Sequence, residues 1–148
     1  MRILIAAAVI AAIPALAQDA AKSAEGVVVV PAAEIAKRVS AVATSSTVTS
    51  TDKYSVLFSH RTVDGTPDRH ANWTDVMVML HGEVTLTTGG TISGNTVDAN
   101  GESHGGIITG GTTVVLHEGD YLRVPAGVPH LMTAPKGDFR YFVTKVHI

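Results

Sequence analysis

From residue 54 to the C-terminus, apolar residues either alternate with polar residues or form short continuous runs, as they do in β-strands. These runs predict strands at 54–60, 75–86, 112–116, 121–124, 130–133 and 139–146. The longest run is interrupted at Gly82 and Glu83. Many short strands separated by turn residues favour an all-β domain, either a closed barrel or two packed sheets.

Upstream of residue 54 the apolar spacing changes. Residues 27–30 predict a short strand, and Pro31 suits the first position of a helix. Ile35, Val39 and Val42 then recur at helical spacing. We therefore predict one short N-terminal helix that ends in the Thr- and Ser-rich stretch at 44–51.

The first 17 residues predict a secretory signal peptide. Arg2 precedes an apolar stretch at 3–16 that is too short to span a bilayer, and residues 15–17 form an Ala-Leu-Ala cleavage pattern. We expect a signal peptide at 1–17, an N-terminal arm with the short helix at 18–50, and a barrel domain at 51–148. Such a protein is periplasmic or secreted, with no membrane contact after cleavage.

Composition narrows the partners and the chemistry. Cleavage after Ala17 removes one basic residue and leaves ten basic and thirteen acidic residues, so no basic patch for nucleic acid is expected. The chain has no cysteine but seven histidines. Any metal must therefore be held by nitrogen and oxygen ligands.

One run near the C-terminus combines turn residues with a histidine: Gly119, Pro125, Gly127 and His130. Gly119 begins a turn into a strand, and Pro125 and Gly127 bend the chain before His130 opens the next strand. The spacing resembles the second conserved motif of the cupin family, except that Ala134 stands where that motif ends in asparagine. The resemblance implies a cupin-type double-stranded β-helix, a jelly-roll barrel, with the histidine as a metal ligand inside it.

The first cupin motif has two histidines and a glutamate ahead of a glycine, and a partial match to it ends at Gly82. Asp68 stands at the first histidine, His70 at the second and Asp75 at the glutamate. The resemblance implies that His70, Asp75 and His130 hold one divalent transition metal, which is copper, zinc, manganese or iron. Two imidazoles and one carboxylate leave coordination positions open for substrate or oxidant.

Two further residues are candidates for catalysis. Asp68 either adds an oxygen ligand, orients His70, or acts as an acid or base. His60 continues the face of Tyr54 along its strand, which we expect to point into the barrel, where His60 assists as a ligand or an acid/base. In cupins that bind no metal, the histidine matching His130 contacts a sugar or acts as a base instead.

Two surfaces have more than one interpretation. The glycine-rich insertion at 89–111 is either one excursion with similar hairpin turns at its two ends, or a loop that covers the barrel mouth and selects a ligand. Val76, Val78 and Leu80 make the second face of their strand apolar, which predicts a homodimer contact unless the N-terminal segment covers it.

These observations favour an exported mononuclear-metal cupin enzyme acting on a small organic or carbohydrate substrate. An oxidoreductase or oxygenase is expected, with copper-dependent oxidative polysaccharide cleavage as one option within the family. The alternative is a cupin without enzymatic activity that binds a metal or small ligand for sensing, storage or transport.

Overall fold

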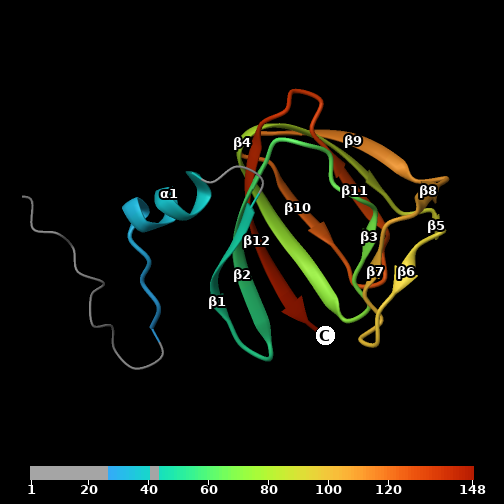
Figure 1. Ribbon diagram of the computed structural model, residues 1–148, viewed down its shortest axis with the longest axis horizontal. Helices are drawn as coiled ribbons and strands as arrows, with labels where there is room; N and C mark the ends of the chain where they lie inside the picture. The colour runs from blue at the N-terminus through green and yellow to red at the C-terminus, as the bar shows by residue number, and fades with distance from the viewer. Residues whose placement is uncertain (1–26, 41–43) are drawn as a thin grey trace, which may run out of the picture.

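A computed structural model describes residues 27–40 and 44–148, which form a β-barrel with one short helix (Figure 1). The elements in chain order are α1 (Ala32–Ser40), β1 (Thr44–Ser50), β2 (Tyr54–Arg61), β3 (Asp68–Arg69), β4 (Trp73–Thr88), β5 (Thr91–Ser93), β6 (Thr96–Val97), β7 (Ser103–His104), β8 (Ile107–Thr109), β9 (Thr112–His117), β10 (Tyr121–Val124), β11 (His130–Thr133) and β12 (Phe139–His147). The all-β prediction is confirmed. No helix in these two ranges is long and apolar enough to cross a membrane.

Two antiparallel layers make up the barrel, and β4 belongs to both. The first half of β4 pairs with β12 and β10, and β12 continues through β2 to β1. The second half of β4 pairs with β9 and β11, and β11 continues through β3 and β7 to β6. We call these layers the first and second sheets.

A bend at Gly82 lets one strand serve both sheets. Gly82 has φ +79°, and a Cβ at this position would lie 2.1 Å from the carbonyl oxygen of Asp138. The register with β12 shifts between Arg140 and Tyr141, which lie opposite the bend. The predicted interruption at this glycine is therefore a bulge within one 16-residue strand and not the end of a strand.

The core lies between the two sheets and contains residues from both. Its buried apolar side chains are Met77, Met79, Val84, Leu86, Leu116, Leu122, Val124, Met132, Phe139, Tyr141 and Val143. Alternation along β12 supplies three of them, because every second residue from Phe139 faces inward.

The N-terminal segment differs in part from expectation. The short helix is confirmed as α1, and the carbonyl oxygen of Pro31 accepts hydrogen bonds from the amides of Glu34 and Ile35. The strand predicted at 27–30 is wrong, because this segment has no regular structure and three of its valines are more than half exposed. Residues 44–50, expected to belong to the N-terminal arm, form β1 and extend the first sheet. The signal-peptide prediction and Val42 lie outside the described residues.

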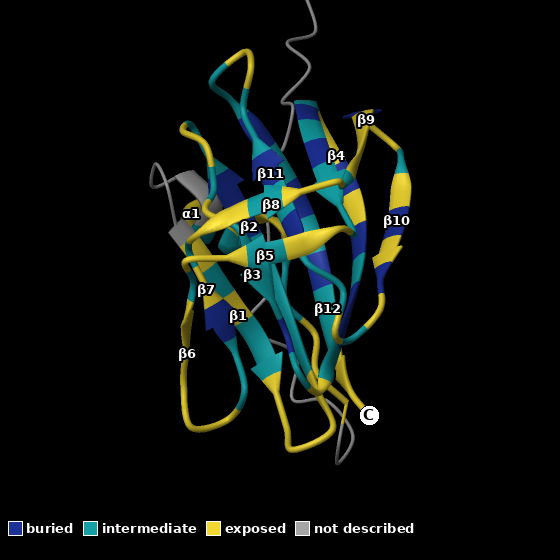
Figure 2. Ribbon diagram, turned by 90° about the vertical axis from the view of Figure 1, so that its right-hand side faces the viewer, coloured by how far each residue is buried: buried dark blue, intermediate teal, exposed yellow. Residues whose placement is uncertain are grey.

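The insertion at 89–111 folds into two nested antiparallel pairs. β5 pairs with β8, and farther out β6 pairs with β7. β7 also joins β3, which ties the insertion to the second sheet. Figure 2 shows β5, β6 and β8 largely exposed on the side of the barrel. The insertion is therefore one excursion, as expected, but the glycine pairs at its two ends are bends between the β4–β9 and β5–β8 ladders and not separate hairpin turns.

Candidate metal centre

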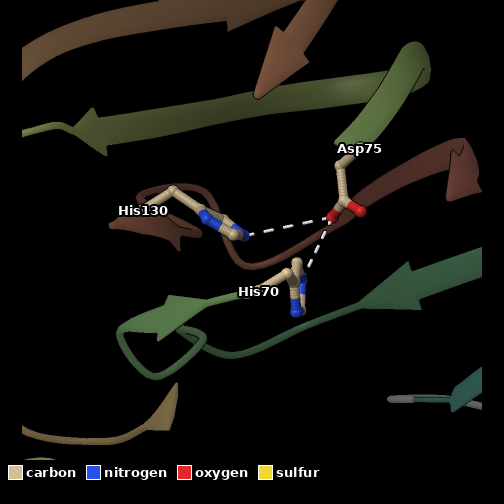
Figure 3. A group of neighbouring side chains, drawn as sticks. All are labelled: His70, Asp75 and His130. Carbon is tan, nitrogen blue, oxygen red and sulfur yellow. Dashed lines mark ion pairs between the residues drawn. The ribbon is translucent and has the colours of Figure 1, made fainter. Parts of the chain in front are cut away.

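The structure brings His70, Asp75 and His130 together inside the barrel (Figure 3). His70 follows β3, Asp75 lies near the start of β4 and His130 begins β11. One potential ligand atom from each residue lies within 4.8 Å of the others. The exposed fractions of the three residues are 9%, 2% and 6%, so the cluster is almost closed to bulk water.

A backbone hydrogen bond joins the two motifs identified in the sequence. The amide of Gly127 donates to the carbonyl oxygen of His70 at 2.7 Å, and the neighbouring amide of Ala126 donates to Thr74 Oγ1 at 3.3 Å. Gly127 has φ +80°, which glycine adopts without strain. The turn before β11 therefore positions the chain on which His70 and Asp75 lie.

Hydrogen bonds also set the orientation of both imidazole rings. His130 Nδ1 lies 3.2 Å from the carbonyl oxygen of Val128, which can only accept, so Nδ1 carries the proton. His70 Nδ1 contacts a carboxylate oxygen of Glu102. Both rings therefore direct Nε2 toward Asp75, at 3.4 Å for His70 and 4.0 Å for His130.

Glu102 is a site residue that the sequence analysis missed. It comes from the glycine-rich insertion, and its second carboxylate oxygen accepts a 3.1 Å hydrogen bond from the amide of Ala71. Asp98 stabilises the turn before it by accepting hydrogen bonds from the amides of Asn100 and Glu102. A carboxylate that fixes the far nitrogen of a histidine is a common partner of metal-binding imidazoles. The insertion thus serves the site by orienting His70.

Lys145 is the second missed residue, and it contacts two of the three donors. Its Nζ is 2.7 Å from His70 Nε2 and 2.8 and 3.0 Å from the two carboxylate oxygens of Asp75. The alternation of β12 contains the signal for it, because Phe139, Tyr141, Val143 and Lys145 occupy one face. A lysine near a strand end is usually taken as a solvent-exposed charge, which is why it was not identified.

The pKa values of the three donors shift in different directions. Burial and the charge of Lys145 disfavour the charged form of His70, but the hydrogen bond and charge of Asp75, together with Glu102, outweigh both and raise the pKa of this imidazole. Burial also opposes ionisation of Asp75, yet its contacts with His70 and Lys145 lower its pKa. For His130, burial dominates and lowers the pKa, which keeps this ring neutral.

Asp68 lies beside the cluster, and both line a cavity between the two sheets. Its carboxylate is 3.8 Å from His70 Nε2 and 3.1 Å from Nδ1 of His104, a residue of the insertion. The contact that fixes His70 through Nδ1 is made by Glu102 and not by Asp68.

His60 lies on the opposite side of the first sheet from the cluster. The cavity is lined by Leu57, Ser59 and Arg61, which alternate with His60 along β2. His60 Nε2 instead lies 2.8 Å from Asp138 Oδ1. The expected inward orientation is wrong because the more apolar face of β2 lies on the outer side of the sheet, where Phe58 packs edge-on against Phe142. The cavity face is the more polar one and carries Ser59 and Arg61.

A cavity of about 190 Å³ extends from the cluster between the two sheets. Its apolar lining consists of Leu57, Met77, Met132, Phe139, Tyr141 and Val143. Its polar lining includes the hydroxyl groups of Ser45 and Ser59, which hydrogen-bond at 2.7 Å. This volume is below the roughly 300–1,000 Å³ of most ligand pockets, so it limits a ligand to a small molecule.

The donor set fits a divalent transition metal. Two imidazole nitrogens with fixed tautomers and one ionised carboxylate converge from three strands or loops, and Glu102 supports one of the rings. The ammonium of Lys145 is a cation already in contact with two of these donors. A metal must therefore displace Lys145, whose side chain is 26% exposed and flexible.

The chain matches no protein-family model and no curated protein sequence. Solved structures match it by shape. KdgF from Halomonas sp. aligns with a TM-score of 0.51 at 15% identity, covering 70% of this chain and 79% of that one. The Cnp3 cupin domain from Schizosaccharomyces pombe aligns with a TM-score of 0.53 at 9% identity, covering 70% of this chain and 60% of that one. Similarity at this level shows a shared fold.

Proposed function

We propose that this protein, whose fold is the cupin barrel, is an exported enzyme that binds one divalent transition metal through His70, Asp75 and His130. The observation that carries the proposal is the orientation of the two rings. Each Nδ1 is engaged, by Glu102 or by the carbonyl oxygen of Val128, so each Nε2 is directed toward Asp75, and at His70 it is the atom that Lys145 must leave before a metal binds. Cupin fold and donor triad together fit a metal-binding cupin.

The proposed substrate is a small organic molecule. The three donors are each less than 10% exposed, and the adjoining cavity has a volume of about 190 Å³. A polysaccharide chain needs an open groove to reach a metal, so this geometry supports a small molecule over polysaccharide cleavage. A metal held by two histidines and one carboxylate supplies a Lewis-acid and redox centre with open coordination positions, which supports an oxidoreductase.

The chain's own residues bind and orient the substrate in this proposal. The apolar cavity wall excludes water, and the paired hydroxyls of Ser45 and Ser59 offer hydrogen bonds to it. Lys145, once displaced from Asp75, remains in the cavity as a proton donor. Asp68 lines the cavity 3.8 Å from His70 Nε2 and is a carboxylate outside the triad that can take up a proton.

Elemental analysis of the desalted protein tests the metal site. After incubation with copper, zinc, manganese or iron, the wild type is expected to retain one metal ion per chain, and His70→Ala and His130→Ala are expected to retain almost none. The exposed His117 provides the matched control, His117→Ala. A wild type without stoichiometric metal, or variants that hold as much as the wild type, would show that the site is wrong.

A second candidate function is metal binding without catalysis, for sensing, storage or transport. The contact of Lys145 with His70 and Asp75 favours it, because a metal that must displace an ammonium binds less tightly and exchanges more readily. Oxidant consumption distinguishes the two functions. The enzyme is expected to consume dioxygen or peroxide with a reductant faster than free metal does, and the binding protein is not.

Export and dimerisation complete the proposal. Export rests on the sequence pattern of residues 1–17, and N-terminal sequencing of the protein from the periplasm or medium tests it.

The dimer contact rests on Val78 and Leu80, which are 37% and 42% exposed on β4, and on Tyr121, which pairs with Val78 from β10. Light scattering of wild type and Val78→Glu tests that contact.

A further inference from the structure

We infer that Arg61 forms a carboxylate-binding subsite in the cavity, so that the ligand of this protein is a small organic acid. The inference deepens the proposed function by naming the substrate class, and it rests on that function only for the chemistry carried out at the metal. The binding of the acid itself depends on Arg61 and the cavity wall.

Arg61 lies at the end of the cavity away from the donor triad. It pairs with Phe139 at the start of β12, whereas Lys145, which contacts the triad, lies six residues farther along the same strand. Six residues of strand extend about 20 Å. Both residues line the cavity, so it extends along β12 from Arg61 to the triad.

The charge of Arg61 is not compensated by a carboxylate. Within ranges 27–40 and 44–148, its guanidinium makes no ion pair and no side-chain hydrogen bond. The nearest acidic residues along the chain and across the strand pair are engaged elsewhere: Asp64 accepts the amide of Ala134 at 2.7 Å, and Asp138 contacts His60. By contrast, the other cavity cation, Lys145, is paired with Asp75.

The chemistry of a guanidinium selects the ligand. Arginine keeps its charge at every physiological pH and presents parallel N–H donors that match the two oxygens of a carboxylate. Partial burial beside Phe139, its partner across the strand pair, strengthens the attraction, because less water screens it. A carboxylate is therefore the ligand group that Arg61 accommodates.

The residues that line the cavity between its two ends determine the polarity of the ligand that fits there. Tyr141, Val143, Met77 and Met132 present apolar surface, and the hydroxyls of Ser45 and Ser59 add one polar position. A body with few polar groups fits this wall better than a highly charged one. The ligand is thus an organic acid with a mainly apolar chain or ring, and its far end points to the triad.

Calorimetric titration of the wild type with matched acids and amides tests the inference. The probes are butanoate, hexanoate and 3-phenylpropanoate, each with its primary amide, together with inorganic phosphate. At least one acid is expected to bind at least ten times more tightly than its amide. If no acid is preferred to its amide, or if phosphate binds as tightly as the best acid, the inference is overturned. This comparison requires no variant to fold.

Two variants assign the binding to this residue. Arg61→Gln is expected to lower the affinity for the best-binding acid at least tenfold. Arg123→Gln, on the exposed face of β10, is expected to leave that affinity unchanged. An Arg61→Gln protein that binds the acid like the wild type overturns the inference. Metal content is measured on the same samples. If an acid binds but the protein holds no stoichiometric metal, the proposed metal function is rejected and the carboxylate subsite stands. If metal binds but no acid is preferred to its amide, the carboxylate subsite is rejected and the metal function stands.

Discussion

Lys145 and Asp75 form an ion pair inside the barrel, with Nζ 2.8 Å from Oδ1. The carboxylate is 3% exposed and also faces both histidines of the candidate metal centre. In the metal-free protein this ammonium supplies the positive charge that a buried carboxylate requires. The same atom that stabilises the empty site therefore competes with a metal for it.

Replacing Lys145 is expected to separate these two effects. Lys145→Met removes the competing cation, so metal affinity is expected to increase by about tenfold or more, since like charges repel strongly at this distance in a buried site. The metal-free variant is expected to lose about 3 kcal/mol of unfolding free energy, because Asp75 is left buried without its partner. Calorimetric metal titration and urea unfolding measure the two effects.

The control is Lys136→Met, which removes a lysine paired with Glu83 at the surface. It is expected to change stability by less than about 1 kcal/mol. Unchanged metal affinity in Lys145→Met would show that the ammonium does not compete for the donors.

Glu102 is expected to control metal affinity without contacting the metal. Glu102→Gln keeps the size of the side chain but weakens the interaction that fixes His70 through Nδ1. Metal affinity is expected to fall about 10- to 100-fold. Metal competition with a chromophoric chelator measures the change. Glu118→Gln, at a side chain that is 69% exposed, is the control, and an equal effect of both changes would contradict the assigned role.

The two site histidines are expected to titrate on opposite sides of pH 6.5 in the metal-free protein. The pKa of His70 is raised, so its charged form stabilises the fold below pH 6.5 and this contribution is lost as the pH rises through its folded pKa. The pKa of His130 is lowered, so its neutral form stabilises the fold above pH 6.5 and the contribution is lost as the pH falls. Imidazole NMR titration, assigned with His70→Ala and His130→Ala, measures both. The reverse order would refute the described contacts.

Gly82 is expected to be far less tolerant of a side chain than Gly89. Both have positive φ, at +79° and +78°, so alanine at either position costs about 1–2 kcal/mol of backbone strain. At Gly82 the added Cβ also meets the carbonyl oxygen of Asp138, whereas nothing lies within 4 Å at Gly89. Gly82→Ala is expected to lose about 3 kcal/mol or more. Thermal unfolding of both variants measures the difference, and equal losses would contradict the bulge.

The strands near the second motif were predictable because turn residues delimit them. β10 and β11 have the predicted bounds, and Gly119, Pro125 and Gly127 mark the turns around them. His130 follows from the same spacing. β1 was not predictable in this way, because its Ser and Thr residues carry no apolar alternation and it forms by pairing with β2.

The donor triad was predictable from spacing, but its surroundings were not. Glu102 lies 32 residues from His70, and only the folding of the insertion brings the two together. Lys145 lies 70 residues from Asp75 and depends on the register of β12 against β4. His60 was placed on the wrong face because alternation cannot distinguish the two sides of a strand that is covered on both.

The continuity of β4 through Gly82 has a consequence for unfolding. One strand is hydrogen-bonded to β10 and β12 in the first sheet and to β9 and β11 in the second, so neither sheet can separate while the other stays intact. The barrel is therefore expected to open as a single cooperative unit, with the β4 amides the slowest to exchange with solvent. Asp75 and His130 lose their arrangement in that same event, so release of a metal held at the proposed site is expected to accompany global unfolding.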